Sequence, residues 1–205
     1  MPSSLPSSMM ADQSMAAIPH QELELKAVVS DPAGMAGRLA GAGAVAIFSG
    51  TMRDRWYDRD GELTARDVVL RTRLLRGDDG TRESVLGWKG PTRLSADGYK
   101  LRDELEYKIE GGVLPDPLLL ALGYTVVHAR DRTIQMYRMG NATIRVEHYP
   151  LMDILVEVEG SPEAIERAIT ATGIDRGEFT PESLSQFVLR YEGRTGEKAL
   201  VSFPT

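Results

Sequence analysis

Residues 21–29 read Q-E-L-E-L-K-A-V-V, and charged and apolar side chains alternate along this stretch. Successive side chains of a β-strand point to opposite faces of a sheet, so residues two apart share a face. Glu22, Glu24 and Lys26 therefore share one face, and Leu23 and Leu25 share the other. The stretch predicts a strand with one charged face and one apolar face.

The same alternation recurs along the chain between turn signals such as Asp60-Gly61, Asp79-Gly80 and Gly140-Asn141. These residues tolerate the positive backbone angles of tight hairpins, so neighbouring strands should pair antiparallel. About eight strands are predicted, near residues 21–29, 45–57, 66–76, 82–90, 99–109, 124–138, 142–149 and 151–160.

Four helices are predicted from their start signals and apolar stripes. One begins at Asp31-Pro32, a short one covers Pro115 to Leu122, and two follow Ser161-Pro162 and Thr180-Pro181. In the last two, Ser or Thr is the expected N-cap and Pro the first helical residue.

The chain of 205 residues is read as one α+β domain over residues 20–205, preceded by a disordered N-terminal tail at 1–19 that is rich in Ser, Pro and Met. Its formal net charge of −6 argues against a nucleic-acid or anionic-membrane partner. The absence of cysteine excludes disulfides and thiolate chemistry and fits a cytoplasmic location. The three histidines lack zinc-ligand spacing, and no apolar run is long enough to span a membrane.

Nearly every predicted strand carries a charged row like that of the first strand. One interpretation is the solvated face of an amphipathic sheet. However, several rows hold charges of one sign, which repel each other unless an opposite charge lies between them. The charged rows of the later strands, whether of one sign or mixed, are Arg71 and Arg73; Lys89; Lys100, Arg102, Glu104 and Glu106; Arg130 and Arg132; Arg145 and Glu147; and Glu157 and Glu159.

A closed barrel with the charged face inward gives these rows a use. Carboxylates inside it could share divalent cations, and arginines could hold a polyanion. Because charges removed from water cost several kcal/mol each, such a lumen needs water or a charged ligand. Trp56 and Trp88 are interpreted as barrel packing rather than base-stacking platforms.

The ordered set of motifs resembles the CYTH superfamily, the triphosphate tunnel metalloenzymes. Glu22 to Lys26 resembles the family's ExExK signature, which alone is weakly specific. The match continues in order through Asp54-Arg55-Trp56-Tyr57-Asp58, Leu70-Arg71-Thr72-Arg73, Trp88-Lys89-Gly90-Pro91, Arg102-x-Glu104-x-Glu106, Arg130-x-Arg132 and Glu157-x-Glu159.

The resemblance implies a closed eight-stranded antiparallel β-barrel with flanking helices, and Mg²⁺ or Mn²⁺ as cofactor. The implied triphosphate contacts are Lys26, Arg71, Arg73, Lys89, Arg102, Arg130 and Arg132. The implied metal ligands are Glu22, Glu24, Glu157 and Glu159, with Glu104 and Glu106 as further candidates. Glu24, Lys26 and Glu147 are the implied catalytic residues.

The chain departs from the family pattern at three places. Arg130 stands where Lys is common, and Glu147 where Asp is common, so both positions keep their charge. Leu184 to Phe187 replaces a Lys-Ser-Tyr segment that is usual in the C-terminal helix, which removes a cation from the end of the barrel.

Three functions remain open at this point. The favoured one is divalent-metal-dependent hydrolysis of a triphosphate, which could be inorganic tripolyphosphate, thiamine triphosphate or a nucleoside triphosphate. The alternatives are a class IV adenylyl cyclase and a non-catalytic polyphosphate or nucleotide sensor. The expected partner is a small-molecule triphosphate, and whether the chain forms a homodimer is left open.

Overall fold

The computed structural model of the chain describes residues 20–109 and 113–203, so the tail expected at 1–19 lies outside the described residues. The strands are β1 (His20–Val28), β2 (Val45–Asp58), β3 (Val69–Gly77), β4 (Arg82–Lys89), β5 (Arg93–Leu94), β6 (Lys100–Ile109), β7 (Thr125–Met139), β8 (Ala142–His148) and β9 (Leu155–Glu159). The helices are α1 (Pro32–Gly41), α2 (Asp116–Ala121), α3 (Pro162–Thr172) and α4 (Leu184–Thr195), with 3-10 turns at Thr64–Arg66 and Arg176–Glu178.

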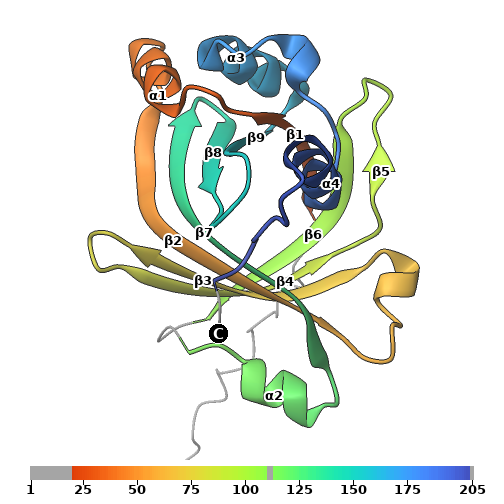
Figure 1. The fold of residues 1–205 in the computed structure, drawn as a ribbon. Helices are drawn as coiled ribbons and strands as arrows, with labels where there is room; N and C mark the ends of the chain where they lie inside the picture. Colours follow the sequence, from red (N-terminus) through yellow and green to blue (C-terminus); the bar gives the residue numbers. More distant parts are fainter. Residues whose placement is uncertain (1–19, 110–112, 204–205) are drawn as a thin grey trace, which may run out of the picture.

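Eight of the strands close into an antiparallel barrel in the order β1-β9-β8-β7-β2-β3-β4-β6, and β1 pairs with β6 to complete the ring. The short strand β5 lies outside the ring on the edge of β6. Figure 1 shows the barrel with α1 and α3 over one side and α4 near one end. The predicted fold class, an eight-stranded barrel with flanking helices, is confirmed.

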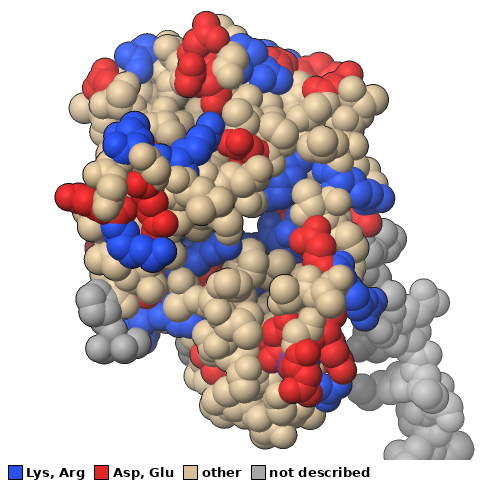
Figure 2. Space-filling view, turned by 45° about the vertical axis from the view of Figure 1, so that its right-hand side comes forward, with Lys and Arg blue, Asp and Glu red and all other residues tan. Residues whose placement is uncertain are grey.

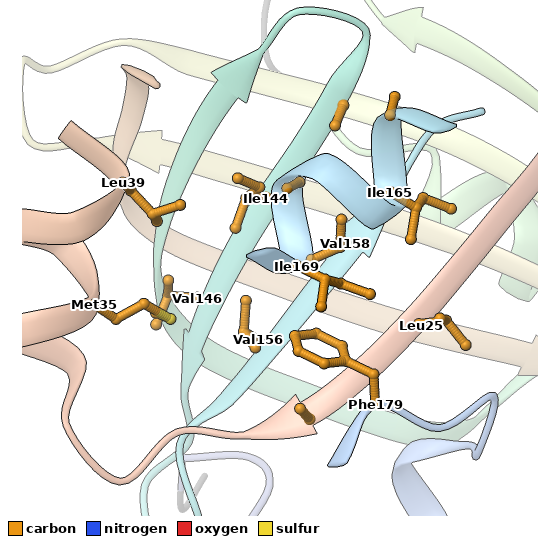
Figure 3. Packing of buried hydrophobic residues seen from close by; sticks show 14 of the residues in the cluster. Leu25, Met35, Leu39, Ile144, Val146, Val156, Val158, Ile165, Ile169 and Phe179 are labelled. Atoms are coloured by element: carbon orange, nitrogen blue, oxygen red, sulfur yellow. The ribbon is translucent and has the colours of Figure 1, made fainter. Parts of the chain in front are cut away.

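The main hydrophobic core lies outside the barrel wall, between its apolar outer face and the helices (Figure 3). Leu25, Val156 and Val158 project from the strands, and Ile165 and Ile169 project from α3. Each of these side chains is at most 2% exposed. Because the helices cover this apolar face, the alternate side chains on the same strands must point into the barrel.

A smaller core holds α4 against the end of the barrel. Leu184 and Phe187 from α4 pack on Leu155 of β9. The chain after α4 adds a backbone bridge between Leu151 and Leu200. The start of α4 is thereby fixed beside the barrel opening.

The boundaries of some elements differ from the sequence prediction. Helix α4 begins at Leu184, not after Thr180-Pro181, because Thr180 forms two backbone hydrogen bonds with Lys26 of 2.9 and 2.8 Å. The Gln186 side chain accepts the Ser183 N–H at 2.8 Å and so caps the helix one turn later.

Three strand predictions also need correction. The third strand begins at Val69, because residues 64–66 form a 3-10 turn, and the last begins at Leu155 rather than near 151. Strand β5 was not predicted, since a two-residue strand carries no alternation. No helix in residues 20–109 and 113–203 is long and apolar enough to cross a membrane.

Candidate active site

Two cavities of about 540 and 330 Å³ occupy the barrel lumen. Arg71, Arg73, Lys89 and Arg145 line both of them, so the two cavities adjoin inside the barrel. Figure 2 shows an opening through the molecule with Lys and Arg side chains around it. The charged rows of the strands therefore face a common enclosed space.

The smaller cavity has an excess of positive charge. Its walls carry nine Lys and Arg side chains against five Asp and Glu, an excess of four cations. All seven predicted triphosphate contacts are in these walls: Lys26, Arg71, Arg73, Lys89, Arg102, Arg130 and Arg132. The cavity thus has the charge that a triphosphate requires.

Many of the charged side chains in the lumen are almost fully removed from solvent. Glu147 is 2% exposed and Arg132 is 3% exposed. A buried charge is tolerated only when it is paired and hydrogen-bonded. The pairing of these side chains therefore decides what the lumen can bind.

Five of the charges form an alternating series along β1, β9 and β8. The Lys26 ammonium lies 2.7 Å from Glu24 and 2.6 Å from Glu157. Arg145 pairs with Glu157 on one side and lies 3.0 Å from Glu147 on the other. Burial opposes ionisation of Glu24, but Lys26 and other cations outweigh it and hold the pKa of Glu24 well below its usual range.

The series continues through Glu147 onto β7, β2 and β3. Arg132 Nε donates to Glu147 at 2.9 Å, and Tyr149 donates its hydroxyl to the other Glu147 oxygen at 2.9 Å. Arg132 Nη1 lies 3.0 Å from Asp54, and Arg73 donates to Asp54 from Nε at 2.8 Å and from Nη2 at 3.1 Å. Both oxygens of Glu147 and of Asp54 are therefore engaged with cations or hydroxyl donors.

Two buried guanidinium groups keep a nitrogen without a well-aligned hydrogen bond to a described residue, although that of Arg132 lies near Asp54. Arg71 Nε and Arg132 Nη1 have no hydrogen-bond partner in the part of the chain that the structure describes. Arg130 lies over the ring of Trp56 at 3.8 Å and forms no ion pair with a described residue. Buried donors of this kind need an acceptor from a ligand or from water.

Three carboxylates gather where a metal ion could bind. Glu22, Glu24 and Glu157 each offer an oxygen, and these oxygens lie within 4.8 Å of one another. Oxygen donors of this type suit Mg²⁺ and Mn²⁺. Burial and the neighbouring Glu22 raise the pKa of Glu104 to about 8 and raise the pKa of Glu159 well above its usual range. Within the group itself, burial opposes ionisation of Glu22 and Glu24, but Lys89 and Lys26 outweigh it and lower the pKa of both. These carboxylates are therefore ionised and offer the oxygen donors that a divalent cation takes.

The other three predicted ligands, Glu104, Glu106 and Glu159, are not in the three-carboxylate group but line the larger cavity. Glu106 pairs with Arg71 at 2.7 Å. Lys89 bridges Glu22, at 2.7 Å, and Glu104. Arg102 donates to the backbone carbonyls of Gly90 and Asp67, both at 2.6 Å.

Several lumen residues were not among the sequence-based candidates. Asp54, Lys100, Arg145 and Tyr149 all line the smaller cavity. The strand period had already placed Lys100 and Arg145 in the charged rows, without a role in the site. Asp54 and Tyr149 each lie two residues from another lumen side chain, so the same period could have indicated them. Trp56, interpreted as packing, lines the same cavity, and so do Ser183 to Gln186 at the start of α4.

Solved structures share this architecture. The PH1819 protein from Pyrococcus horikoshii OT3 matches with a TM-score of 0.66 at 24% identity, over 82% of this chain and 98% of that chain. A candidate adenylate cyclase from Vibrio parahaemolyticus matches with a TM-score of 0.67 at 16% identity, over 82% and 97%. The chain shares the fold of these structures, a closed eight-stranded antiparallel barrel.

A third structure with this fold is the candidate adenylyl cyclase HpAC1 from Hippeastrum, described as having a dominant triphosphatase activity. Its TM-score is 0.56 at 17% identity, over 87% of this chain and 97% of that chain. No family sequence model and no curated protein sequence matches the chain. Since these identities establish the fold alone, the activity must be argued from the lumen itself.

Proposed function

We propose that the chain hydrolyses a triphosphate in its tunnel with the help of a divalent cation. The observation that carries this proposal is the smaller cavity, with its excess of four cations and its buried guanidinium donor at Arg71 Nε that lacks an acceptor among the described residues. A triphosphate supplies both the negative charge and the acceptor oxygens. Arginine forks suit phosphate oxygens, and the lysines act as point charges.

Glu22, Glu24 and Glu157 would hold Mg²⁺ or Mn²⁺ beside these cations. When bound, the ion would neutralise charge on the phosphoryl oxygens. The protein cations orient the chain of phosphates and stabilise the charge that develops during transfer. Lys26 lies between Glu24 and Glu157, so it places a positive charge beside the three-carboxylate group.

Glu24 and Glu157 both belong to the three-carboxylate group and line the smaller cavity. We assign Glu24 the task of orienting the attacking water, since its ion pairs with Lys26 and Lys100 use one oxygen, whereas both oxygens of Glu157 are paired with cations. Glu147 serves differently, because both of its oxygens accept hydrogen bonds from Arg132, Arg145 and Tyr149. It positions the two guanidiniums toward the substrate.

Adenylyl cyclisation is the second candidate, because two of the matching structures carry an adenylate cyclase name. Cyclisation needs the same cations and also a base pocket and a group that deprotonates the ribose hydroxyl. Hydrolysis needs only water as the nucleophile. The description of HpAC1 as dominantly a triphosphatase also favours hydrolysis.

The test is to incubate the protein with tripolyphosphate, ATP or thiamine triphosphate, with Mg²⁺ or Mn²⁺, and to identify the products by phosphorus NMR. Orthophosphate that forms with metal and not with EDTA supports hydrolysis. Pyrophosphate together with cyclic AMP would replace hydrolysis by cyclisation. Tight binding with no product would indicate a sensor.

A further inference from the structure

Asp54 is the one lumen carboxylate of the ion-pair series whose charge contacts only candidate triphosphate-binding arginines. It lies on β2, opposite Arg73 in the β2–β3 register, and is 2% exposed. Both of its oxygens face the guanidiniums of Arg73 and Arg132. It does not belong to the carboxylate group that could hold a metal ion.

The contacts of Asp54 use the guanidinium edges that a phosphate would need. Arg73 directs Nε and Nη2 to Asp54, which is the edge that binds two oxygens of one acid group at once. Arg132 directs Nε to Glu147 and holds Nη1 3.0 Å from Asp54 without hydrogen-bond alignment. A phosphate that approaches these arginines therefore meets a fixed carboxylate on the same donors.

We propose that Asp54 is an internal counter-anion that competes with the bound triphosphate for Arg73 and Arg132. This inference rests on the proposed function, because it takes the triphosphate as the ligand. With the tunnel empty, Asp54 neutralises two buried guanidiniums that would otherwise repel each other. With the ligand bound, the carboxylate and the phosphates share or exchange those donors, and their mutual repulsion weakens binding. Arg73 and Arg132 keep Asp54 ionised against the effect of burial.

A second role for Asp54 predicts the opposite result. If the carboxylate only held the arginines in place, its removal would let their side chains move and would weaken binding of the triphosphate. A unit charge about 5 Å from a phosphate, at the effective dielectric constant of a protein site, changes affinity by at least ~10-fold. The sign of the change therefore separates a competitor from a positioning group.

The experiment is calorimetric titration of tripolyphosphate in EDTA, where no turnover takes place. Asp54→Asn keeps the shape and removes the charge, and we expect its Kd to fall at least ~10-fold below that of the wild type. Asp103→Asn is the matched control, since Asp103 pairs with Arg93 on the outer side of β6, and its Kd should not change. Asp54→Ser is a second neutral variant in case Asp54→Asn does not fold.

An unchanged or raised Kd in the neutral Asp54 variant that folds would overturn the inference while leaving the proposed function intact. Absence of tripolyphosphate binding in the wild type and in the variants would overturn both. Circular dichroism and the melting temperature establish that the compared proteins are folded.

Discussion

The buried charges of the lumen alternate in sign from Glu24 through to Arg73, and each interior cation of this series touches two carboxylates. Lys26, Arg145 and Arg132 all lie between two acids. Breaking a buried pair by removing one partner costs about 3–5 kcal/mol, because the other charge stays behind. Substitutions in the lumen therefore change stability as well as function, so each is compared with a control substitution whose side chain lies outside the lumen.

Replacing Arg73 by Ala should lower kcat/KM for the hydrolysed triphosphate at least ~100-fold, as expected for loss of one preorganised charge donor. Arg76→Ala is the matched control, since Arg76 lies on the same strand and is exposed on the outer face. Initial rates with tripolyphosphate and Mg²⁺ measure the effect. A rate for Arg73→Ala equal to that of Arg76→Ala would remove Arg73 from the site.

Asp58 should give a pH-dependent contribution to stability outside the tunnel. Its carboxylate accepts the Thr64 hydroxyl and the N–H groups of Arg59, Leu63 and Thr64, and these bonds lower its pKa to about 2. A folded pKa below the unfolded value of about 3.9 stabilises the protein above pH ~4, and this stabilisation is lost as the pH falls toward 2.

Urea denaturation of wild type and Asp58→Asn between pH 2 and 6 checks this expectation. The wild type should be more stable above pH 4, and the difference should shrink toward pH 2. Asp97→Asn, at an exposed turn residue, is the control and should show no such trend. A difference that stays constant with pH would mean that the charge of Asp58 does not stabilise the turn.

At the residue scale, the strand period predicts which side chains share a face, and this is how Glu22, Glu24, Arg71 and Arg73 were found. It does not predict which charges neutralise each other. Asp54 meets Arg132 across two strands, a contact between residues 78 positions apart that no local pattern encodes. The distinction between free and paired cations therefore required the structure.

At the scale of elements, long alternating strands and helices with strong start signals were predicted within a few residues. Helix α3 begins as expected, with Ser161 accepting the Ala164 N–H and Pro162 as the first residue. The start of α4 was placed too early, because Thr180-Pro181 has the same local signal and tertiary pairing of Thr180 with Lys26 overrides it.

The packing of α3 on the barrel should contribute strongly to stability. Ile165 is fully buried between α3 and the strands, so Ile165→Ala leaves a cavity and should cost about 2–5 kcal/mol of unfolding free energy. Chemical denaturation measures this cost, and Arg167→Ala on the exposed side of α3 should have little effect. Equal stability of the two variants would contradict the assignment of this face as core.

At the scale of the whole molecule, the pairing of β1 with both β9 and β6 turns a sheet into a tunnel. Alternation predicts a charged face but not that this face is enclosed. Enclosure follows from the outer apolar face, which α1 and α3 cover at β1, β8 and β9. The strand that closes the ring also carries Glu22, Glu24 and Lys26, so the closure brings the acidic and basic groups of the site together.

Ligand binding should therefore stabilise the closed barrel as a unit. A ligand that binds only the folded state at 100 times its Kd adds about 2.7 kcal/mol, which for a chain of this size corresponds to a rise in Tm of about 5–10 °C. We expect this rise with tripolyphosphate in EDTA, where it is not hydrolysed, measured by scanning calorimetry. Orthophosphate at equal ionic strength should give a much smaller rise, because it cannot reach cations on several strands at once.

The rise in Tm should also be lost in Arg73→Ala and reduced by added salt, which screens the charges at the openings of the lumen. An equal rise with orthophosphate, or an undiminished rise in Arg73→Ala, would mean that the anion binds outside the tunnel.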